Sequence, residues 1–224
     1  MWYKVLFMEN KNESLETLQD IKRIMERSSR FISLSGVSGI AAGVCALAGT
    51  WFAYDLIYEY YARFNEQGYN GSEFSKLKLN LLLMAAGVLA AALISSLYFT
   101  SRRAKQNQQK LWDHTSKRLL FNLLVPLMAG GIFILAMLQQ DEWRFVAPAC
   151  LIFYGLALVN ASKYTLSEVR YLGFLEIILG LINTQYIGYG LYFWAAGFGL
   201  LHIVYGVGMW WKYERSPLSP KGGT

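Results

Sequence analysis

Residues 171–211 read "YLGFLEIILGLINTQYIGYGLYFWAAGFGLLHIVYGVGMWW", and this stretch decides the fold. It belongs to two apolar runs, 169–188 and 191–211, which are divided only by the "GYG" of residues 188–190. Each run has about the 20 residues that a helix needs to cross the hydrocarbon core of a bilayer. Because the glycine-containing break suits a tight reversal, the stretch predicts two antiparallel membrane helices.

The rest of the chain repeats this pattern. Of its 224 residues, 54% are hydrophobic and only 16% are charged, whereas soluble domains carry about 25% charge. Four further apolar runs precede the two above, at residues 31–54, 77–100, 119–138 and 143–161. The sequence therefore predicts an all-α, six-transmembrane-helix bundle over residues 31–211, with an N-terminal cytoplasmic segment 1–30 and a cytoplasmic tail 212–224.

Charge orients these spans. With a cytoplasmic N-terminus, the cytoplasmic segments hold 17 of the 21 lysines and arginines, and only Arg63, Lys76, Lys78 and Arg144 fall outside them. This positive-inside pattern predicts that both termini lie in the cytoplasm. Basic loops beside anionic lipid account for the net charge of +6, so no nucleic-acid partner is expected.

Residues 14–30, "SLETLQDIKRIMERSSR", place apolar side chains on one side at helical spacing. They predict an amphipathic cytoplasmic helix that leads into the first span. Two roles stay open for it: packing on the bundle or the lipid headgroups, and docking of a cytoplasmic protein partner.

Small and polar residues form stripes along three predicted spans. In the fifth span Gly173, Glu176, Gly180 and Asn183 follow at spacings of three, four and three, which puts them on one face. Comparable stripes on the first and sixth spans contain Ser35, Ser38, Ala42, Cys45 and Gly49, and Ala195, Gly199, His202 and Gly206. Small residues allow close helix contacts in lipid, so Glu176 and His202 are expected to face protein, and the stripes also suit a homo-oligomer.

The polar residues share one depth. At about 1.5 Å per residue from the flanking basic residues, Glu176 lies roughly 9 Å, Ser38 about 12 Å and His202 about 15 Å from the cytoplasmic edge. This indicates a polar pocket in the cytoplasmic half. The candidate ligand- or proton-binding residues are Glu176, His202, Ser38, Asn160, Asn122 and Tyr205.

Glu176 is the sharpest candidate. An ionised acid at mid-helix costs roughly 2.5–3.5 kcal/mol on insertion scales, unless a proton, a partner or water relieves it. His202 is the only histidine in the predicted spans, so we expect a contact between Glu176 and His202. A proton-coupled or ligand site is one interpretation, and an interhelical hydrogen bond that fixes packing is the other.

Most catalytic classes lack their residues here. No lysine lies within a predicted span for a retinal Schiff base, and one histidine cannot supply both axial ligands of a haem. HExxH and P-loop motifs are absent, and Cys45 and Cys150 have no CxxC spacing. We therefore expect no cofactor, no metal and no enzymatic activity.

One motif keeps a remote alternative open. "GVSG", residues 36–39, matches the GxSG string of rhomboid proteases, and a Ser38–His202 dyad would make an intramembrane serine hydrolase. Three features depart from that family. The string lies on the first span instead of a central one, and the supporting polar residues of the family are missing. Ser38 is expected in the cytoplasmic half of the membrane, whereas that family cuts its substrates toward the other side.

Two stretches, "IMERSSRFISLSGVSGIAAGV" and the segment from "YTLSEVRYLGFLEIILG" to "GMWWKYER", resemble a group of small bacterial six-span membrane proteins known only as hypothetical proteins. The resemblance implies an architecture, a location in the bacterial inner membrane and a regulated, accessory role, without an assigned activity. The leading functional prediction is a transporter- or channel-like protein that binds or moves a small solute, a proton or a lipid. The alternative is a membrane sensor or scaffold that regulates a protein partner.

Overall fold

The computed structural model describes residues 34–68, 70–106 and 112–215, and every secondary-structure element in these ranges is helical. The amphipathic helix predicted at residues 14–30 lies outside the described residues. The main helices are α2 (Gly36–Gln67), α3 (Gly71–Gln106), α4 (His114–Gln139), α5 (Val146–Ala161), α6 (Glu168–Gln185), α7 (Gly190–Trp194) and α8 (His202–Tyr213). Between them lie the 3-10 turns η1 (Trp143–Phe145), η2 (Ser162–Tyr164) and η3 (Ile187–Tyr189), and the π-helical segment η4 (Ala195–Leu201).

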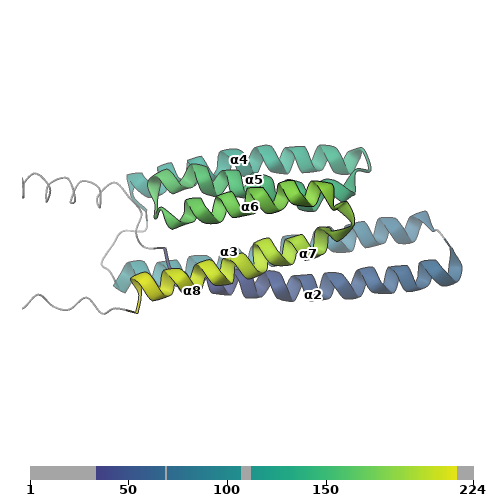
Figure 1. Cartoon of the computed structure of the whole chain (residues 1–224), viewed down its shortest axis with the longest axis horizontal. Coiled ribbons are helices and arrows are strands. Elements are labelled where there is room, and N and C mark those ends of the chain that lie inside the picture. The colour runs from purple at the N-terminus through teal and green to yellow at the C-terminus, as the bar shows by residue number, and fades with distance from the viewer. Residues whose placement is uncertain (1–33, 69, 107–111, 216–224) are drawn as a thin grey trace, which may run out of the picture.

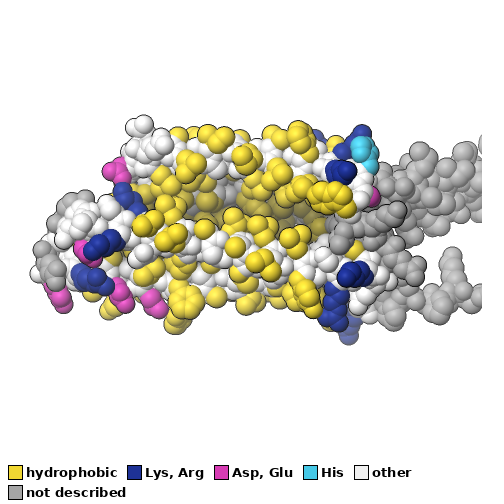
Figure 2. All heavy atoms as spheres, turned by 180° about the vertical axis from the view of Figure 1, so that it is seen from behind, with side chains coloured by type: hydrophobic (Ala, Val, Ile, Leu, Met, Phe, Trp, Pro, Cys, Tyr) yellow, Lys and Arg dark blue, Asp and Glu magenta, His cyan; other side chains and the backbone are white. Residues whose placement is uncertain are grey.

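Within the part of the chain that the structure describes, five helical stretches are long and apolar enough to cross a membrane: Gly36–Glu66, Gly71–Gln106, His114–Gln139, Trp143–Tyr164 and Ile187–Tyr213. The predicted fifth span, α6, lies in the same bundle but carries Glu168, Arg170 and Glu176 within its 18 residues. On the face that Figure 2 shows, hydrophobic side chains cover the middle of the molecule and charged side chains gather at its two ends. This is the character of a multi-pass membrane protein.

The helices form two layers (Figure 1). One layer holds α4, α5 and α6, and the other holds α2, α3 and the continuous rod α7–η4–α8. The α2–α3 hairpin turns at Gly68, whose φ of 78° is a conformation that favours glycine. Figure 2 shows a hollow between the layers on the side of α3 and α4, lined by hydrophobic side chains.

Glycines allow the closest helix contacts. A Cβ added to Gly155 of α5 would lie 2.6 Å from the carbonyl oxygen of Gly173 of α6, and one added to Gly173 would lie 2.7 Å from the carbonyl oxygen of Gly155. In the other layer, a Cβ on Gly206 of α8 would lie 2.6 Å from the carbonyl oxygen of Gly36 of α2. These small residues let backbones touch, as expected for helices that pack without a hydrophobic drive.

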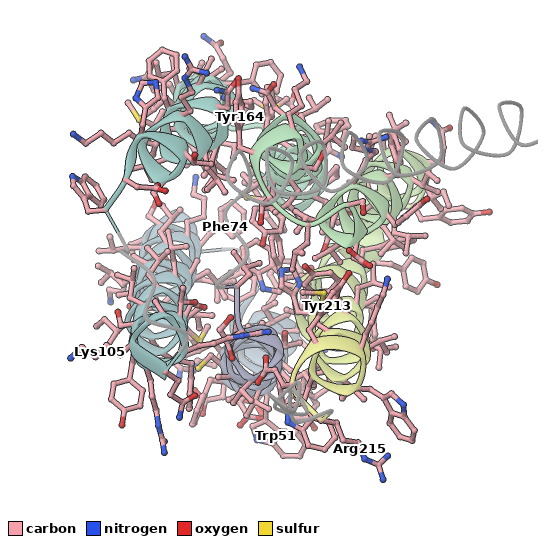
Figure 3. The ribbon with its side chains drawn as sticks, turned by 90° about the vertical axis from the view of Figure 1, so that its left-hand side faces the viewer. Trp51, Phe74, Lys105, Tyr164, Tyr213 and Arg215 are labelled. Atoms are coloured by element: carbon pink, nitrogen blue, oxygen red, sulfur yellow. The ribbon has the colours of Figure 1, made fainter. Side chains whose placement is uncertain are left out.

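One end of the bundle collects the basic residues, and we call it the basic end. Here α2, α4 and α6 begin and α3, α5 and α8 end, on the left of Figure 1. Its lysines and arginines among the described residues are Arg102, Arg103, Lys105, Lys117, Arg118, Lys163, Arg170, Lys212 and Arg215. Seen from this end, Lys105 points away from the bundle while Tyr213 lies between α6 and α8 (Figure 3).

A part-buried ion pair ties three helices together at the basic end. Arg103 Nη1 lies 2.6 Å from Glu214 Oε1 and also donates to the Leu34 carbonyl oxygen. Glu214 Oε1 accepts a hydrogen bond from the Gly36 backbone N–H at 2.5 Å and from the Ser35 hydroxyl at 3.3 Å. The carboxylate thus caps the start of α2, where a negative charge is favourable.

Candidate functional site

Glu176 lies in the middle of α6 and is completely buried. Its neighbours on the same face, Gly173 and Gly180, are also buried, and they bring α6 against α5. Among the described residues, neither carboxylate oxygen of Glu176 has a hydrogen-bond partner. A buried carboxylate without donors is unusual, because buried polar side chains are almost always hydrogen-bonded.

The imidazole of His202 faces this carboxylate. His202 Nδ1 lies 3.5 Å from Glu176 Oε1, within ion-pair distance, but it is aligned with the Gly197 carbonyl oxygen at 3.0 Å. His202 Nε2 lies 2.7 Å from the Tyr154 hydroxyl oxygen. Because a carbonyl oxygen only accepts hydrogen bonds, Nδ1 carries a proton, and in the neutral imidazole Nε2 accepts from Tyr154. We call Glu176, His202 and Tyr154 the buried triad.

An aromatic wall encloses the triad. The Tyr154 ring lies 5.4 Å from the His202 ring and 5.2 Å from the Phe198 ring, and Phe198 in turn lies 4.6 Å from Trp194. These rings come from α5 and from the α7–η4–α8 rod. They exclude water from one side of the imidazole and so strengthen the electrostatic interactions within the triad.

The π-helical segment η4 places the Gly197 carbonyl on the histidine. The carbonyl oxygen of Gly197, which lies in this segment, accepts a hydrogen bond from the side chain of His202, five residues later. Gly197 also leaves room for the acid, since a Cβ at this position would lie 2.5 Å from Glu176 Oε2 and 2.5 Å from Leu151 Cδ2. π-helical turns are rare and occur frequently at functional sites.

This arrangement can hold a proton. An ionised carboxylate removed from water costs several kcal/mol unless it gains a proton or a positively charged partner. Glu176 can take a proton itself, and it can also share one with the imidazole Nδ1, which lies 3.5 Å from Oε1. Among the described residues, no group of three or more His, Cys, Asp or Glu side chains could hold a metal ion.

The other predicted site residues lie in separate sets of hydrogen bonds. Ser38 is buried in the first turn of α2 and donates to the Ser35 carbonyl oxygen at 2.6 Å, while His202 bonds Tyr154 and Gly197. Asn160 Nδ2 donates to the Asn122 carbonyl oxygen at 2.8 Å, which joins α5 to α4. The structure therefore brings Glu176 and His202 together and joins Asn122 to Asn160. Ser38 instead makes its hydrogen bond within the first turn of α2.

Tyr205, the sixth candidate, lies one helical turn after His202. Its hydroxyl is buried and has no hydrogen-bond partner among the described residues. Its ring packs against Leu158, Val169 and Leu172, the buried apolar cluster between α5 and α6. Tyr205 thus lies on the side of the triad that leads to the basic end.

A second polar group closes the bundle there, formed by Glu168, Lys212 and Tyr213. Glu168 Oε1 accepts hydrogen bonds from Lys212 Nζ and, at 2.7 Å, from the Tyr213 hydroxyl. Burial disfavours ionisation of Glu168, but the hydrogen bonds from Lys212 and Tyr213 outweigh it and hold the pKa of this carboxyl below its ordinary value. Glu168 is therefore a carboxylate at neutral pH.

Sequence reasoning missed Tyr154 and Gly197. Tyr154 stands in an apolar run where a tyrosine is ordinarily a packing residue, and only the distance to His202 reveals its role. Gly197 belongs to a glycine-rich stretch, "AAGFGLL", that has no pattern distinguishing a π-helix from an α-helix.

Comparison of the chain with protein-family models, with curated proteins and with solved structures finds no match.

Proposed function

We propose that this chain is a multi-pass protein of the bacterial inner membrane in which the buried triad binds a proton and couples it to the binding or movement of a small solute. The observation that carries the proposal is Glu176, which is fully buried, has no hydrogen-bond partner among the described residues, and lies 3.5 Å from His202 Nδ1. Ionisable groups inside a membrane protein are costly and mark ion or proton pathways by default.

The distribution of charge supports an orientation. Nine lysines and arginines of the described residues lie at the basic end, and four, Arg63, Lys76, Lys78 and Arg144, lie at the opposite end. Under the positive-inside rule the basic end faces the cytoplasm. The start of α2 and the end of α8 both lie at this end, which supports the proposal that both termini are cytoplasmic.

The hydrogen-bond pattern favours a proton site over a packing contact. A contact that only fixed packing would be expected to satisfy the carboxylate, because a half-satisfied buried network is worse than an apolar one. Here the nearest donor, His202 Nδ1, is aligned with the Gly197 carbonyl, so Glu176 stays without a hydrogen bond from the described residues. A carboxyl that gains and loses a proton fits this arrangement.

The test is infrared spectroscopy of the full chain in lipid vesicles. A protonated carboxylic acid has a C=O stretching band that is absent from a carboxylate. Titration of the vesicle sample from acid to alkaline pH should therefore make this band disappear, and titration back should restore it. Exposed Asp and Glu side chains are carboxylates at neutral pH, so the expected result is that the part of the band that is present at neutral pH is lost in Glu176→Gln. It should persist in the control Glu66→Gln, which makes the same change at an exposed position near the end of α2.

Proton flux measured with a pH-sensitive dye inside the same vesicles tests the coupling. Wild-type vesicles should acidify or alkalise in response to an imposed gradient once the coupled solute is present, and Glu176→Gln and His202→Gln vesicles should not. The proposal fails if Glu176→Gln keeps the infrared band, because the titrating carboxyl is then elsewhere.

A further inference from the structure

The hydroxyl of Tyr205 lies between two polar groups that are otherwise separate. Tyr205 packs against the apolar cluster of Leu158, Val169 and Leu172, as Tyr154 of the buried triad also does. Val169 directly follows Glu168 in α6, so the same cluster reaches the polar group at the basic end. The hydroxyl is buried and makes no hydrogen bond with the described residues. A buried donor without an acceptor costs about 1–3 kcal/mol, so its retention calls for an explanation.

An unpaired acceptor lies at the outer side of this hydroxyl. Glu168 uses Oε1 for Lys212 and Tyr213, while its other oxygen, Oε2, is buried and has no partner among the described residues. One unpaired donor and one unpaired acceptor are therefore buried in the same half of the bundle, and Tyr205 packs against Val169, the residue next to Glu168.

The helix geometry explains why a third residue is needed between the two acids. Glu168 and Glu176 lie eight residues apart on α6, which is about 12 Å along the helix axis. A proton cannot cross that distance in one step. On the neighbouring helix α8, His202, Tyr205 and Tyr213 descend from the depth of Glu176 to that of Glu168.

We infer that Tyr205 relays protons between Glu168 at the basic end and the buried triad, an inference that rests on the proposed function. A proton taken up by the Glu168 carboxylate passes to the Tyr205 oxygen as Tyr205 gives its own proton to the Tyr154 oxygen. Tyr154 gives its proton to His202 Nε2, and the Nδ1 proton of His202 passes to Glu176 Oε1. Each intermediate atom gains one proton and loses one, so the net result is one proton moved from Glu168 to Glu176.

The described conformation has part of this relay assembled. Tyr154 already lies 2.7 Å from the nitrogen that receives its proton. Nδ1 lies 3.5 Å from Glu176 Oε1 but is aligned with the Gly197 carbonyl oxygen, so the last step requires the Nδ1 proton to leave that carbonyl. The link through Tyr205 is open, because its hydroxyl bonds neither neighbour. The Tyr205 ring packs against the apolar cluster of Leu158 and Val169. A movement of this ring would bring its hydroxyl into hydrogen-bond distance and complete the relay.

The opposite direction along α6 is tightly packed. Above Glu176, a Cβ on Gly180 would lie 2.7 Å from Ile152 Cγ1 and 3.0 Å from the Pro148 carbonyl oxygen of α5. The titratable and charged groups around Tyr205 are Tyr154 from α5, Glu168 from α6, and His202, Lys212 and Tyr213 from α8. We place the entry of the relay at the basic end because Glu168, with its unpaired Oε2, lies there.

A kinetic experiment on the full chain in lipid vesicles tests the relay. A photolabile acid releases protons in a flash, and time-resolved infrared spectroscopy follows the carboxylic acid band that Glu176→Gln removes. Tyr205→Phe removes only the hydroxyl and should slow the rise of this band by about tenfold or more, while its final amplitude stays that of the wild type. Glu168→Gln should also slow the rise.

The control is Tyr171→Phe, which makes the same change on an exposed side chain of α6 and should keep the wild-type rate. A wild-type rate in Tyr205→Phe overturns the relay while leaving the proton site intact. Slowing in Tyr205→Phe with a wild-type rate in Glu168→Gln overturns the assignment of Glu168 as the entry point. A band that survives Glu176→Gln overturns the proposed function and the relay together.

Discussion

The Tyr154 hydroxyl oxygen lies 2.7 Å from His202 Nε2, and the opposite ring nitrogen, Nδ1, lies 3.0 Å from the Gly197 carbonyl oxygen. Both nitrogens of one buried imidazole are thus engaged by residues of α5 and of the π-helical segment. The carbonyl dictates the proton position, since it can only accept a hydrogen bond. The tautomer of His202 is a direct consequence of η4, because the π-helical turn aims that carbonyl at the ring.

Nitrogen NMR can check this tautomer. The chain has two histidines, His202 and the exposed His114, so ¹⁵N-labelled histidine gives two sets of ring signals that a His114→Gln variant assigns. At neutral pH, His202 should show a protonated Nδ1 and an unprotonated Nε2. Tyr154→Phe should move the Nε2 signal and leave His114 unchanged. A His202 ring with its only proton on Nε2 would contradict the assignment.

Glycine-to-alanine substitutions test the close contact between α5 and α6. Gly155→Ala would place a Cβ 2.6 Å from the Gly173 carbonyl oxygen, so the helices must separate. We expect a loss of about 1–3 kcal/mol in the free energy of unfolding, measured by denaturation in detergent micelles. Gly131→Ala in α4 meets no atom within 4 Å and should be neutral or stabilising by up to about 1 kcal/mol. Equal stability of the two variants would contradict this packing.

The sequence was sufficient for the helices because their signal is local. Apolar runs of span length predict α2, α3, α4, α5 and α6. The face of α6 followed from the spacing of Gly173, Glu176 and Gly180, which are all buried. Orientation in the membrane remains a prediction from the distribution of charge.

The site was harder to predict because its decisive contacts join distant residues. Tyr154 and His202 are 48 residues apart, and Arg103 and Glu214 are 111 apart. Depth along a helix could suggest that Glu176 and His202 meet, but depth does not show which face α5 presents to them. The π-helical segment has no sequence pattern that distinguishes it from an α-helix, so the carbonyl that orients His202 could not be expected.

Glu168 should make stability depend on pH in the acid range. Its hydrogen bonds to Lys212 and Tyr213 hold its folded-state pKa below the ordinary value, despite burial. This contribution is therefore fully present above the unfolded pKa of about 4.3 and is lost as the pH falls through the lower folded pKa. Glu168→Gln should lower the free energy of unfolding by about 0.2–1 kcal/mol at pH 7, and the difference from the wild type should shrink below about pH 4. A difference that grows toward acid pH would contradict this assignment.

The ion pair of Arg103 and Glu214 should show strong coupling in a double-mutant cycle. Both side chains are only 11% and 18% exposed, and the pair also holds the Leu34 carbonyl and the Gly36 N–H at the start of α2. Arg103→Ala and Glu214→Ala should each cost about 1.5–3 kcal/mol, since each leaves a part-buried charge without its partner. The double variant should lose less stability than the sum of the two single variants, by about 1–2 kcal/mol. The reason is that the second substitution removes the charge that the first one left without a partner. The exposed pair Arg63 and Glu59 of α2 is the control, and its coupling should be about 0.3–0.5 kcal/mol. Additive losses for Arg103 and Glu214 would mean that the two residues stabilise the basic end independently.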